Sequence, residues 1–401
     1  TLRQAASAID RAAGDHLTVA AASGLRAVAL WSTGDLDAAH GAYLTCVDGL
    51  RRAGHISDIL GCSIALADIR ITQGRLGEAA GTYERALRLA AGDAGTVTRG
   101  TADMYVGLSQ LACERGDLDA AAGHLRRARE LGEHTGLPQN PYRWRVAAAR
   151  LRQAQGDLDG ALDLLDEAQR VYVGDFSPEV RPIPALRARV LAAQGRVAPA
   201  LRWVRERGLS VDDDLSYLRE FEHITLARVL LADHAGHAAA RLLGRLEPAA
   251  GRGGRTGNLI EILVLQALVH QAGGDAAAAL VPLERALALA EPEGYVRVFT
   301  DAGAPMAALL RATARQPYVR RLLDGAGGPA TGTRSGLVDP LSERELDVLR
   351  LLATDLDGPD IARRLSVSLN TLRTHTRNIY AKLGVNSRRA AVRQASQLDL
   401  L

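Results

Sequence analysis

A short phrase that recurs about every forty residues constrains the fold of this 401-residue chain more than any other feature. The phrase reads GDLDAA from Gly34, GRLGEAA from Gly74, GDLDAAA from Gly116 and GDLDGAL from Gly156, with weaker copies from Gly195, Gly236 and Gly274. Successive glycines are 40, 42, 40, 39, 41 and 38 residues apart. Such a fixed period is typical of a helical solenoid, in which each unit buries its apolar face only by stacking on its neighbours.

The repeated residues suggest how one unit folds. The glycine can end a helix because it adopts the left-handed backbone conformation at little cost. An aspartate directly after it can accept backbone N–H bonds and cap the next helix; these residues are Asp35, Asp117, Asp157 and Asp275. That second helix carries apolar residues at helical spacing, for example at Leu158, Leu162 and Leu165. Each repeat is therefore predicted to be a pair of helices, and the chain to be all-α.

The composition changes near the C-terminus. Residues 324–340 are dominated by Gly, Pro, Ser and Thr and lack an apolar period, which predicts a flexible linker. We therefore expect a helical-repeat sensor or interaction domain over 1–323, then this linker, and a separate module over 341–401. Residues 361–398 of the module contain eight basic residues and no acidic one, although the formal net charge of the chain is only +3. A local run of one sign can attract a polyanion such as DNA.

Four helices are predicted in the C-terminal module. A capping box of Ser342 and Glu345 opens the first, and Gly358-Pro359 opens the second. The third covers about 369–383, and the fourth starts at Ser387 and ends at about 397. The expected buried positions are Leu346, Leu349, Leu352, Ile361, Ala362, Leu365, Leu372, Ile379, Tyr380 and Leu383. Two short helices joined by a tight turn, the second rich in cations, form a helix-turn-helix.

The outward face of the third helix carries the candidate DNA contacts. If its apolar stripe is buried, helical spacing places four polar residues on the opposite side: Asn370, Arg373, Thr374 and Arg377. Arginine can make two hydrogen bonds to guanine in the major groove, and threonine can contact a phosphate or a thymine methyl group. The alternative is an ordinary solvated face. That alternative predicts mixed charges, and no glutamate is present here.

At these residues the module strongly resembles the LuxR-type DNA-binding domain of bacterial regulators. The matching pieces are LSERELDVLRLLA, DIARRLSVSLNTLRTHTRNIYAKLGV and SRRAAV, within about residues 341–400. The resemblance implies that the groove-facing contacts are Arg373, Thr374 and Arg377. It also implies that the residues holding the DNA backbone are Thr371, Lys382 and Arg388. The fourth helix would help the module to dimerise.

One position departs from the LuxR-type pattern. The family often has a polar residue and a lysine at the opening of the second helix, where this chain has Gly358-Pro359. A phosphate contact from that point is therefore in doubt.

The upstream part resembles the helical-repeat sensor of the large MalT-like branch of LuxR regulators. The pieces that carry this resemblance are RPIPALRARV, LSYLREFEHITLARVLLA and LALAEPEGYVRVFTDAGAPMAALLR. It implies a tetratricopeptide-like helical-repeat solenoid ahead of a four-helix LuxR-type domain. Members of this branch usually carry an N-terminal ATPase domain, which is absent from this sequence. Either the full protein continues N-terminally or the chain is a shortened member.

These features predict a sequence-specific transcriptional regulator. The expected partners are double-stranded DNA, a small-molecule or protein effector in the groove of the repeats, and RNA polymerase, with a homodimer on DNA. The alternative is a helical-repeat interaction scaffold in which DNA binding is secondary. A cytoplasmic protein is expected, because no stretch of eighteen apolar residues or signal-peptide pattern occurs.

An enzyme, a cofactor or a metal site has no support in the sequence. The glycine-rich segment 251–257 lacks the lysine of a phosphate-binding loop, since the only lysine of the chain is Lys382, and we interpret it as a flexible turn. Cys46, Cys62 and Cys113 are expected to sit singly and unbridged in a reducing compartment. The segment 171–184 holds two aromatic residues and three prolines. It either lines a pocket or, the interpretation we favour, is a long loop that packs its own aromatics.

Overall fold

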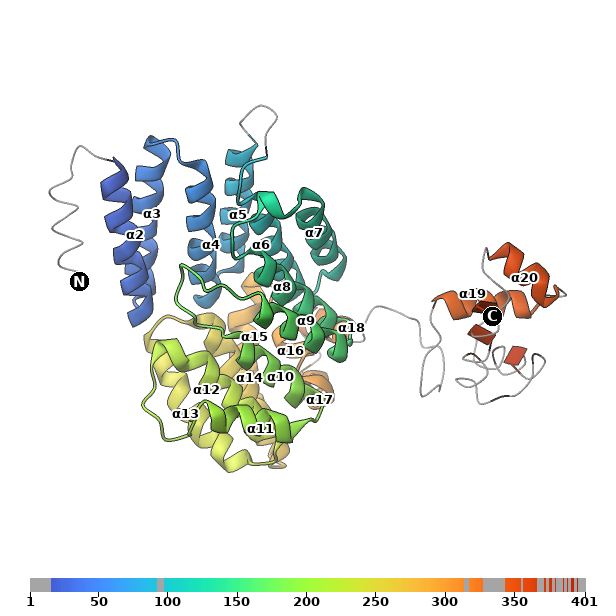
Figure 1. The fold of residues 1–401 in the computed structure, drawn as a ribbon. Coiled ribbons are helices and arrows are strands. Elements are labelled where there is room, and N and C mark those ends of the chain that lie inside the picture. The colour runs from blue at the N-terminus through green and yellow to red at the C-terminus, as the bar shows by residue number, and fades with distance from the viewer. Residues whose placement is uncertain are drawn as a thin grey trace. The chain divides into compact units, whose positions relative to one another are not determined.

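Figure 1 shows the chain as a computed structural model. The structure describes residues 16–91, 97–313, 317–326, 343–354 and 356–365, and the single positions 371, 372, 375, 376, 379, 385, 388, 391, 392 and 395. All regular elements of these residues are helices, which confirms the all-α prediction. The chain divides into two compact units, Thr1–Gly327 and Gly328–Leu401. Among the described helices, none is long and apolar enough to cross a membrane.

The first unit is a series of helix pairs, and each copy of the repeated phrase joins the two helices of one pair. The pairs are α2 (His16–Thr33) with α3 (Leu36–Arg52), α4 (Ile56–Thr72) with α5 (Leu76–Ala90), α6 (Thr101–Glu114) with α7 (Leu118–Leu131), α8 (Asn140–Ala154) with α9 (Leu158–Arg170), α10 (Ile183–Ala193) with α11 (Val197–Glu206), α12 (Tyr217–Ala232) with α13 (Gly236–Arg252), and α14 (Thr256–Ala272) with α15 (Ala276–Ala290).

Shorter elements complete this unit. The helical turn η1 (Glu133–Thr135) precedes α8, and the elements after α15 are η2 (Glu291–Glu293), α16 (Arg297–Thr300), α17 (Gly303–Ala312) and α18 (Pro317–Ala326). The last helix therefore covers the first three positions of the segment 324–340 that the composition predicts as a linker.

The turn chemistry read from the repeats is confirmed where a glycine is followed by aspartate. Gly34 has a φ of 85°, and the side chain of Asp35 accepts a hydrogen bond from the backbone N of Ala38 at 3.2 Å. The other capping aspartates accept the equivalent bond at 2.9 Å; they are Asp117, Asp157 and Asp275. These caps satisfy donors that a helix N-terminus otherwise leaves unpaired.

The copy at Gly236 does not follow this scheme. There His234 holds the left-handed conformation with a φ of 59°, and Gly236 is already the first residue of α13. The N–H groups of His234 and Ala235 donate to the carbonyls of Leu231 and Leu230, as Gly34 and Asp35 do in the first repeat. The turn is therefore shifted two residues upstream, and a non-glycine residue accepts a conformation that costs about 1–2 kcal/mol.

The glycine-rich segment 251–257 contains a turn between two helices, as predicted, although four of its seven residues are helical. Its first two residues end α13 and its last two begin α14. Between them, Arg255 is buried and its guanidinium binds Glu220 with Nη2–Oε2 at 2.6 Å and Nε–Oε1 at 2.9 Å. Asn258 donates to the same carboxylate at 2.6 Å. A buried charge of this kind needs such partners, so the segment is anchored.

The repeats wind until the later helices meet the ends of the first ones, as the blue and yellow helices of Figure 1 show. The C-terminal ends of α2, α4 and α6 pack on the N-terminal ends of α12, α14 and α16. Trp31 Nε1 donates to the hydroxyl of Tyr217 at 2.8 Å, and the backbone N of Val296 donates to the carbonyl of Glu114 at 2.9 Å. The contact pairs the negative ends of three helix dipoles with the positive ends of three others.

The described part of the second unit contains α19 (Glu343–Leu352) and α20 (Gly358–Arg364). Its core includes the predicted apolar positions that are described; the fully buried ones are Leu349, Leu352, Ile361, Ala362, Leu372 and Ile379, joined by Val348, Ala391 and Ala395. Asp357 caps α20 by accepting from the backbone N of Asp360 at 2.8 Å, which the sequence pattern had not identified. Tyr380 and Leu383 lie outside the described residues.

The cysteines are unbridged, but two of them are neighbours. Each lies alone in its helix, as predicted, but Cys46 on α3 and Cys62 on α4 place their sulfur atoms 3.8 Å apart, a proximity that the sequence did not predict. Helix packing, which spacing along the sequence does not show, brings them together. Cys113 is buried on α6.

The winding of the first unit depends on close approach of backbone at Gly257. A Cβ added there would lie 2.5 Å from the carbonyl oxygen of Ile71, whereas one added at Gly244, on α13, would meet nothing within 4 Å. We expect Gly257→Ala to destabilise the protein by about 1–3 kcal/mol through overpacking. Gly244→Ala should stabilise it by about 0.5–1 kcal/mol because alanine favours the helix. Urea unfolding measures both, and equal effects of the two substitutions would contradict the close contact.

Candidate ligand cavity and DNA-binding module

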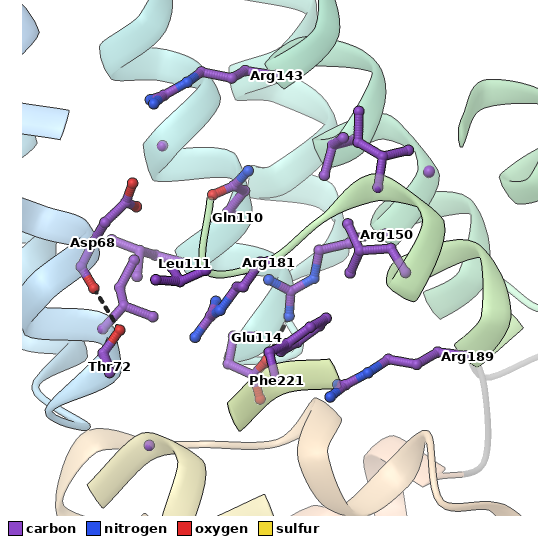
Figure 2. A pocket seen from close by; sticks show the side chains of 18 of the residues that line it. Asp68, Thr72, Gln110, Leu111, Glu114, Arg143, Arg150, Arg181, Arg189 and Phe221 are labelled. Atoms are coloured by element: carbon purple, nitrogen blue, oxygen red, sulfur yellow. Dashed lines mark hydrogen bonds and ion pairs between the residues drawn. The ribbon is translucent and has the colours of Figure 1, made fainter. Parts of the chain in front are cut away.

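The wound repeats enclose a cavity of about 330 Å³. Its wall is one face of the first helix of successive pairs, at helical spacing, as Val106, Gln110 and Glu114 show on α6 and Tyr142, Val146 and Arg150 on α8. Further residues come from α4, α10, α12, α14 and α16. Figure 2 shows side chains from these separate helices converging on one space. This is a typical form for a small-molecule site, with apolar walls and a few polar groups.

The segment between α9 and α10 lines this cavity, so the pocket-lining alternative for residues 171–184 is confirmed. Asp175 fixes the segment by accepting bonds from Arg143 Nε at 3.1 Å and from the hydroxyl of Tyr142. The rings of Tyr142 and Tyr172 meet edge to face at 4.9 Å. The aromatic packing that we favoured is therefore also present, at Tyr172, and the segment brings Arg181 to the cavity.

The lining contains six arginines and seven carboxylates. Most are paired: Arg150 binds Glu114 at 2.8 Å, and Arg189 and Arg228 both bind Glu261, at 2.9 and 2.7 Å. Burial would raise the pKa of Glu261, but the two guanidinium groups outweigh it and lower that pKa to about 2. At Glu114 burial prevails over Arg150 and raises the pKa. Strong desolvation makes these groups sensitive to any charge that enters the cavity.

The two ends of the cavity differ in charge. Toward α4 and the start of α6, burial raises the pKa of Asp68 and of Asp103. Toward α10, the pKa of Arg189 lies below its ordinary value, mainly because the side chain is buried and also because Arg228 and Arg181 are near. Glu261 acts in the opposite direction but does not outweigh these effects. The cavity is therefore polarised, with a surplus of carboxylates at one end and of guanidinium groups at the other.

Apart from the segment 171–184, sequence reasoning placed no residue in a cavity. Part of the signal was present, since Gln110 and Glu114 are one helical turn apart, as are Asp68 and Thr72. Ion pairs such as Arg189 with Glu261 join residues two repeats apart, and periodicity within one helix cannot reveal them.

Most of the predicted DNA contacts lie outside the described residues: Asn370, Arg373, Thr374, Arg377 and Lys382. Thr371 is exposed beside the buried Leu372. Arg388 is half-buried, and its Nε and Nη2 donate to the carbonyls of Leu352 and Thr354 at 2.8 and 2.5 Å. It thus satisfies acceptors at the end of α19, and its predicted contact with the DNA backbone stays a prediction.

Both units match known families. The model described as a MalT-like TPR region matches residues 3–316, and the one described as bacterial regulatory proteins of the luxR family matches residues 339–395. Two curated relatives, both HTH-type transcriptional regulators MalT of Klebsiella pneumoniae (strain 342 and strain MGH 78578), are 27% identical over 325 residues. The match covers 72% of this chain, which spans about a third (35%) of each relative's length.

Among solved structures, a tetratricopeptide repeat protein from Parabacteroides merdae is 14% identical and has a TM-score of 0.34. The similarity covers 67% of this chain and 99% of that one. This score is too low to support an argument about the fold.

The fold and the matches define a helical-repeat protein with a C-terminal helix-turn-helix of the regulatory type. The chain belongs to the MalT-like family of LuxR-type DNA-binding transcriptional regulators.

The shared carboxylate of Glu261 provides a test of the cavity's ion-pair network. Glu261→Gln leaves two buried guanidinium groups without their partner and should destabilise the protein by about 3–5 kcal/mol in urea unfolding. Because the folded pKa of Glu261 is lowered, the wild-type advantage should be full above pH 4.5 and decline as the pH falls toward about 2. The control is Asp166→Asn, which breaks an ion pair with Arg187 that is about half exposed. We expect it to cost under about 1 kcal/mol at any pH, and an equal loss in both variants would contradict the network.

Proposed function

We propose that the protein is a sequence-specific transcriptional regulator that binds double-stranded DNA through the third helix of its C-terminal module. The observation that carries this proposal is the luxR-family match over residues 339–395, which coincides with a run of eight basic and no acidic residues at 361–398. The burial of Leu372 and Ile379, two helical turns apart, supports the predicted outward face. Helical spacing would place Asn370, Arg373, Thr374 and Arg377 there.

The contacts divide by chemistry. Arg373 and Arg377 would read guanine edges in the major groove, and Thr374 would contact a thymine methyl group or a phosphate. Thr371, Lys382 and Arg388 would hold the backbone and fix the register of the helix without reading sequence. Arg388 can do so only with donors that its carbonyl contacts leave free, so we expect it to contribute less than Lys382.

We further propose that the cavity of the repeats binds a small effector and that this binding controls the C-terminal module. The support is a cavity of about 330 Å³ lined by both apolar and charged side chains from ten helices and from segments between helices. A ligand that contacts so many repeats would favour the wound arrangement over a more open one by its differential affinity for the two. A homodimer on a two-fold DNA site, a contact with RNA polymerase and a cytoplasmic location complete the proposal.

A salt titration of DNA affinity tests the main proposal. The whole chain, bound to duplexes selected from a random library, should lose affinity steeply with salt, with about 0.9 in log–log slope for each phosphate contact. Arg373→Ala should cost about 1–3 kcal/mol of discrimination between selected and random duplexes. Fluorescence anisotropy measures both quantities.

Arg350→Ala is the matched control, because Arg350 lies on α19 in a mostly exposed ion pair with Asp347 and outside the basic run. It should leave discrimination unchanged. A flat salt dependence, or equal losses for Arg350→Ala and Arg373→Ala, would refute binding by the third helix.

A further inference from the structure

We infer that the effector is a small organic anion, with an apolar body and a carboxylate or phosphate group that pairs with Arg181 at the cationic end of the cavity. This inference rests on the proposal that the cavity binds an effector, and it specifies the chemistry of that effector.

The first argument is an imbalance of charge at this end. The arginines that line it are Arg150, Arg181, Arg189, Arg228 and Arg297, and the buried carboxylates are Glu114, Glu261 and Asp301. Glu179 also lines the cavity, but it is exposed and interacts with Tyr172 and Arg207. Glu114 pairs with Arg150, Asp301 with Arg297, and Glu261 is shared by two guanidinium groups. Two positive charges therefore have no carboxylate of their own in a desolvated space, where an anionic ligand would be strongly favoured.

The second argument is the position of Arg181. No ion pair joins Arg181 to a carboxylate in the described part of the chain. Its guanidinium carbon lies 5.9 Å from the centroid of the Phe221 ring. Arg181 is exposed and lines the cavity, and Figure 2 shows its side chain directed between Leu111 and Phe221. A guanidinium with free donors is suited to bind a carboxylate or phosphate through two parallel hydrogen bonds.

The third argument comes from Arg189, whose guanidinium group is fixed in position by its contacts. Its Nε donates to Thr225 at 2.8 Å and its guanidinium carbon lies 3.7 Å from the centroid of Phe221. Its Nη2 is buried and has no hydrogen-bond partner among the described residues. Arg189 is thus held against the ring that Arg181 also approaches, and it adds to the positive potential at this end of the cavity.

The walls beside these arginines are apolar, which specifies the rest of the ligand. Leu111, Leu186, Val190 and the edge of Phe221 line the same end. An apolar body attached to the acidic group would cover them and gain about 25 cal/mol for each Å² removed from water. A free inorganic ion would leave these apolar side chains in contact with water and would not gain this free energy.

The opposite end argues against a cation as the principal ligand. Asp68 is the carboxylate most available to attract one, but it already lies within electrostatic reach of Arg143 and Arg181, which oppose the rise in its pKa that burial causes. Asp175 is already bound by Arg143. We therefore expect Asp68 to oppose an anion modestly rather than to recruit a cation.

The test compares four probes of nearly equal size on the whole chain: benzoate, phenyl phosphate, the neutral isostere benzamide and the cation benzylamine. Dissociation constants come from calorimetric titration without DNA. At least one of the two anions should bind tenfold or more tightly than benzamide, because a hydrogen bond to a charged group contributes about 1.5–3 kcal/mol. The tighter anion identifies the acidic group. Equal binding of anions and benzamide, preference for benzylamine, or binding of no anion would overturn the inference.

Three variants locate the site. Arg181→Gln should weaken the anion at least tenfold and leave benzamide unchanged, and Asp68→Asn should strengthen the anion severalfold by removing a like charge. Arg187→Gln is the control, because Arg187 lies on α10 but pairs with Asp166 away from the cavity. Thermal unfolding establishes that each variant is folded. If Arg181→Gln does not change anion binding, the assigned position is wrong. The four-probe comparison uses the unaltered chain and therefore does not depend on whether any variant folds.

A separate readout distinguishes this inference from the proposed function. DNA affinity is measured with and without the bound anion. Anion binding that requires Arg181 but leaves DNA affinity unchanged would support the site and refute control of the module by that anion. DNA affinity that survives while no anion binds would refute the site and leave the DNA-binding proposal standing.

Discussion

The structure depends on the meeting of helix ends that closes the winding of the repeats. The C-terminal ends of α2, α4 and α6 present carbonyl groups, and the N-terminal ends of α12, α14 and α16 present N–H groups. The bond from Val296 to the carbonyl of Glu114 and the bond from Trp31 to Tyr217 join such ends directly. Without this contact the same helix pairs would form an open groove, because each pair packs mainly on its sequence neighbours.

Closure has an electrostatic consequence. It removes a belt of arginines and carboxylates from bulk water, and desolvation makes an unpaired charge costly. The ion pairs of Arg150 with Glu114 and of Arg143 with Asp175 offset this desolvation cost. Where two guanidinium groups share Glu261, the pairing is incomplete, and an incomplete pairing inside an enclosed space is the kind of feature that stability alone does not explain.

The two candidate sites were predictable to different degrees. The helix-turn-helix is a local prediction, since the capping residues, the expected tight turn and the expected cationic helix lie within sixty residues, and the burial of Leu372 and Ile379 agrees with the pattern. The cavity is assembled from residues as far apart as Asp68 and Asp301. The shift of the turn from Gly236 to His234 shows a limit on a smaller scale, because the glycine in this weaker copy of the phrase did not mark the position of the turn.

The sequence by itself determined the period of about forty residues, the aspartate caps at Asp35 and its counterparts, and the run of basic residues in the C-terminal module. These follow from interactions between residues three or four positions apart, which any reader of the sequence can see. Only the tertiary structure decided that the repeats close on themselves, that Cys46 meets Cys62, and that Arg181 enters a cavity without an ion-pair partner among the described residues. Small rotations between successive repeats accumulate into that closure, and no single repeat encodes their sum.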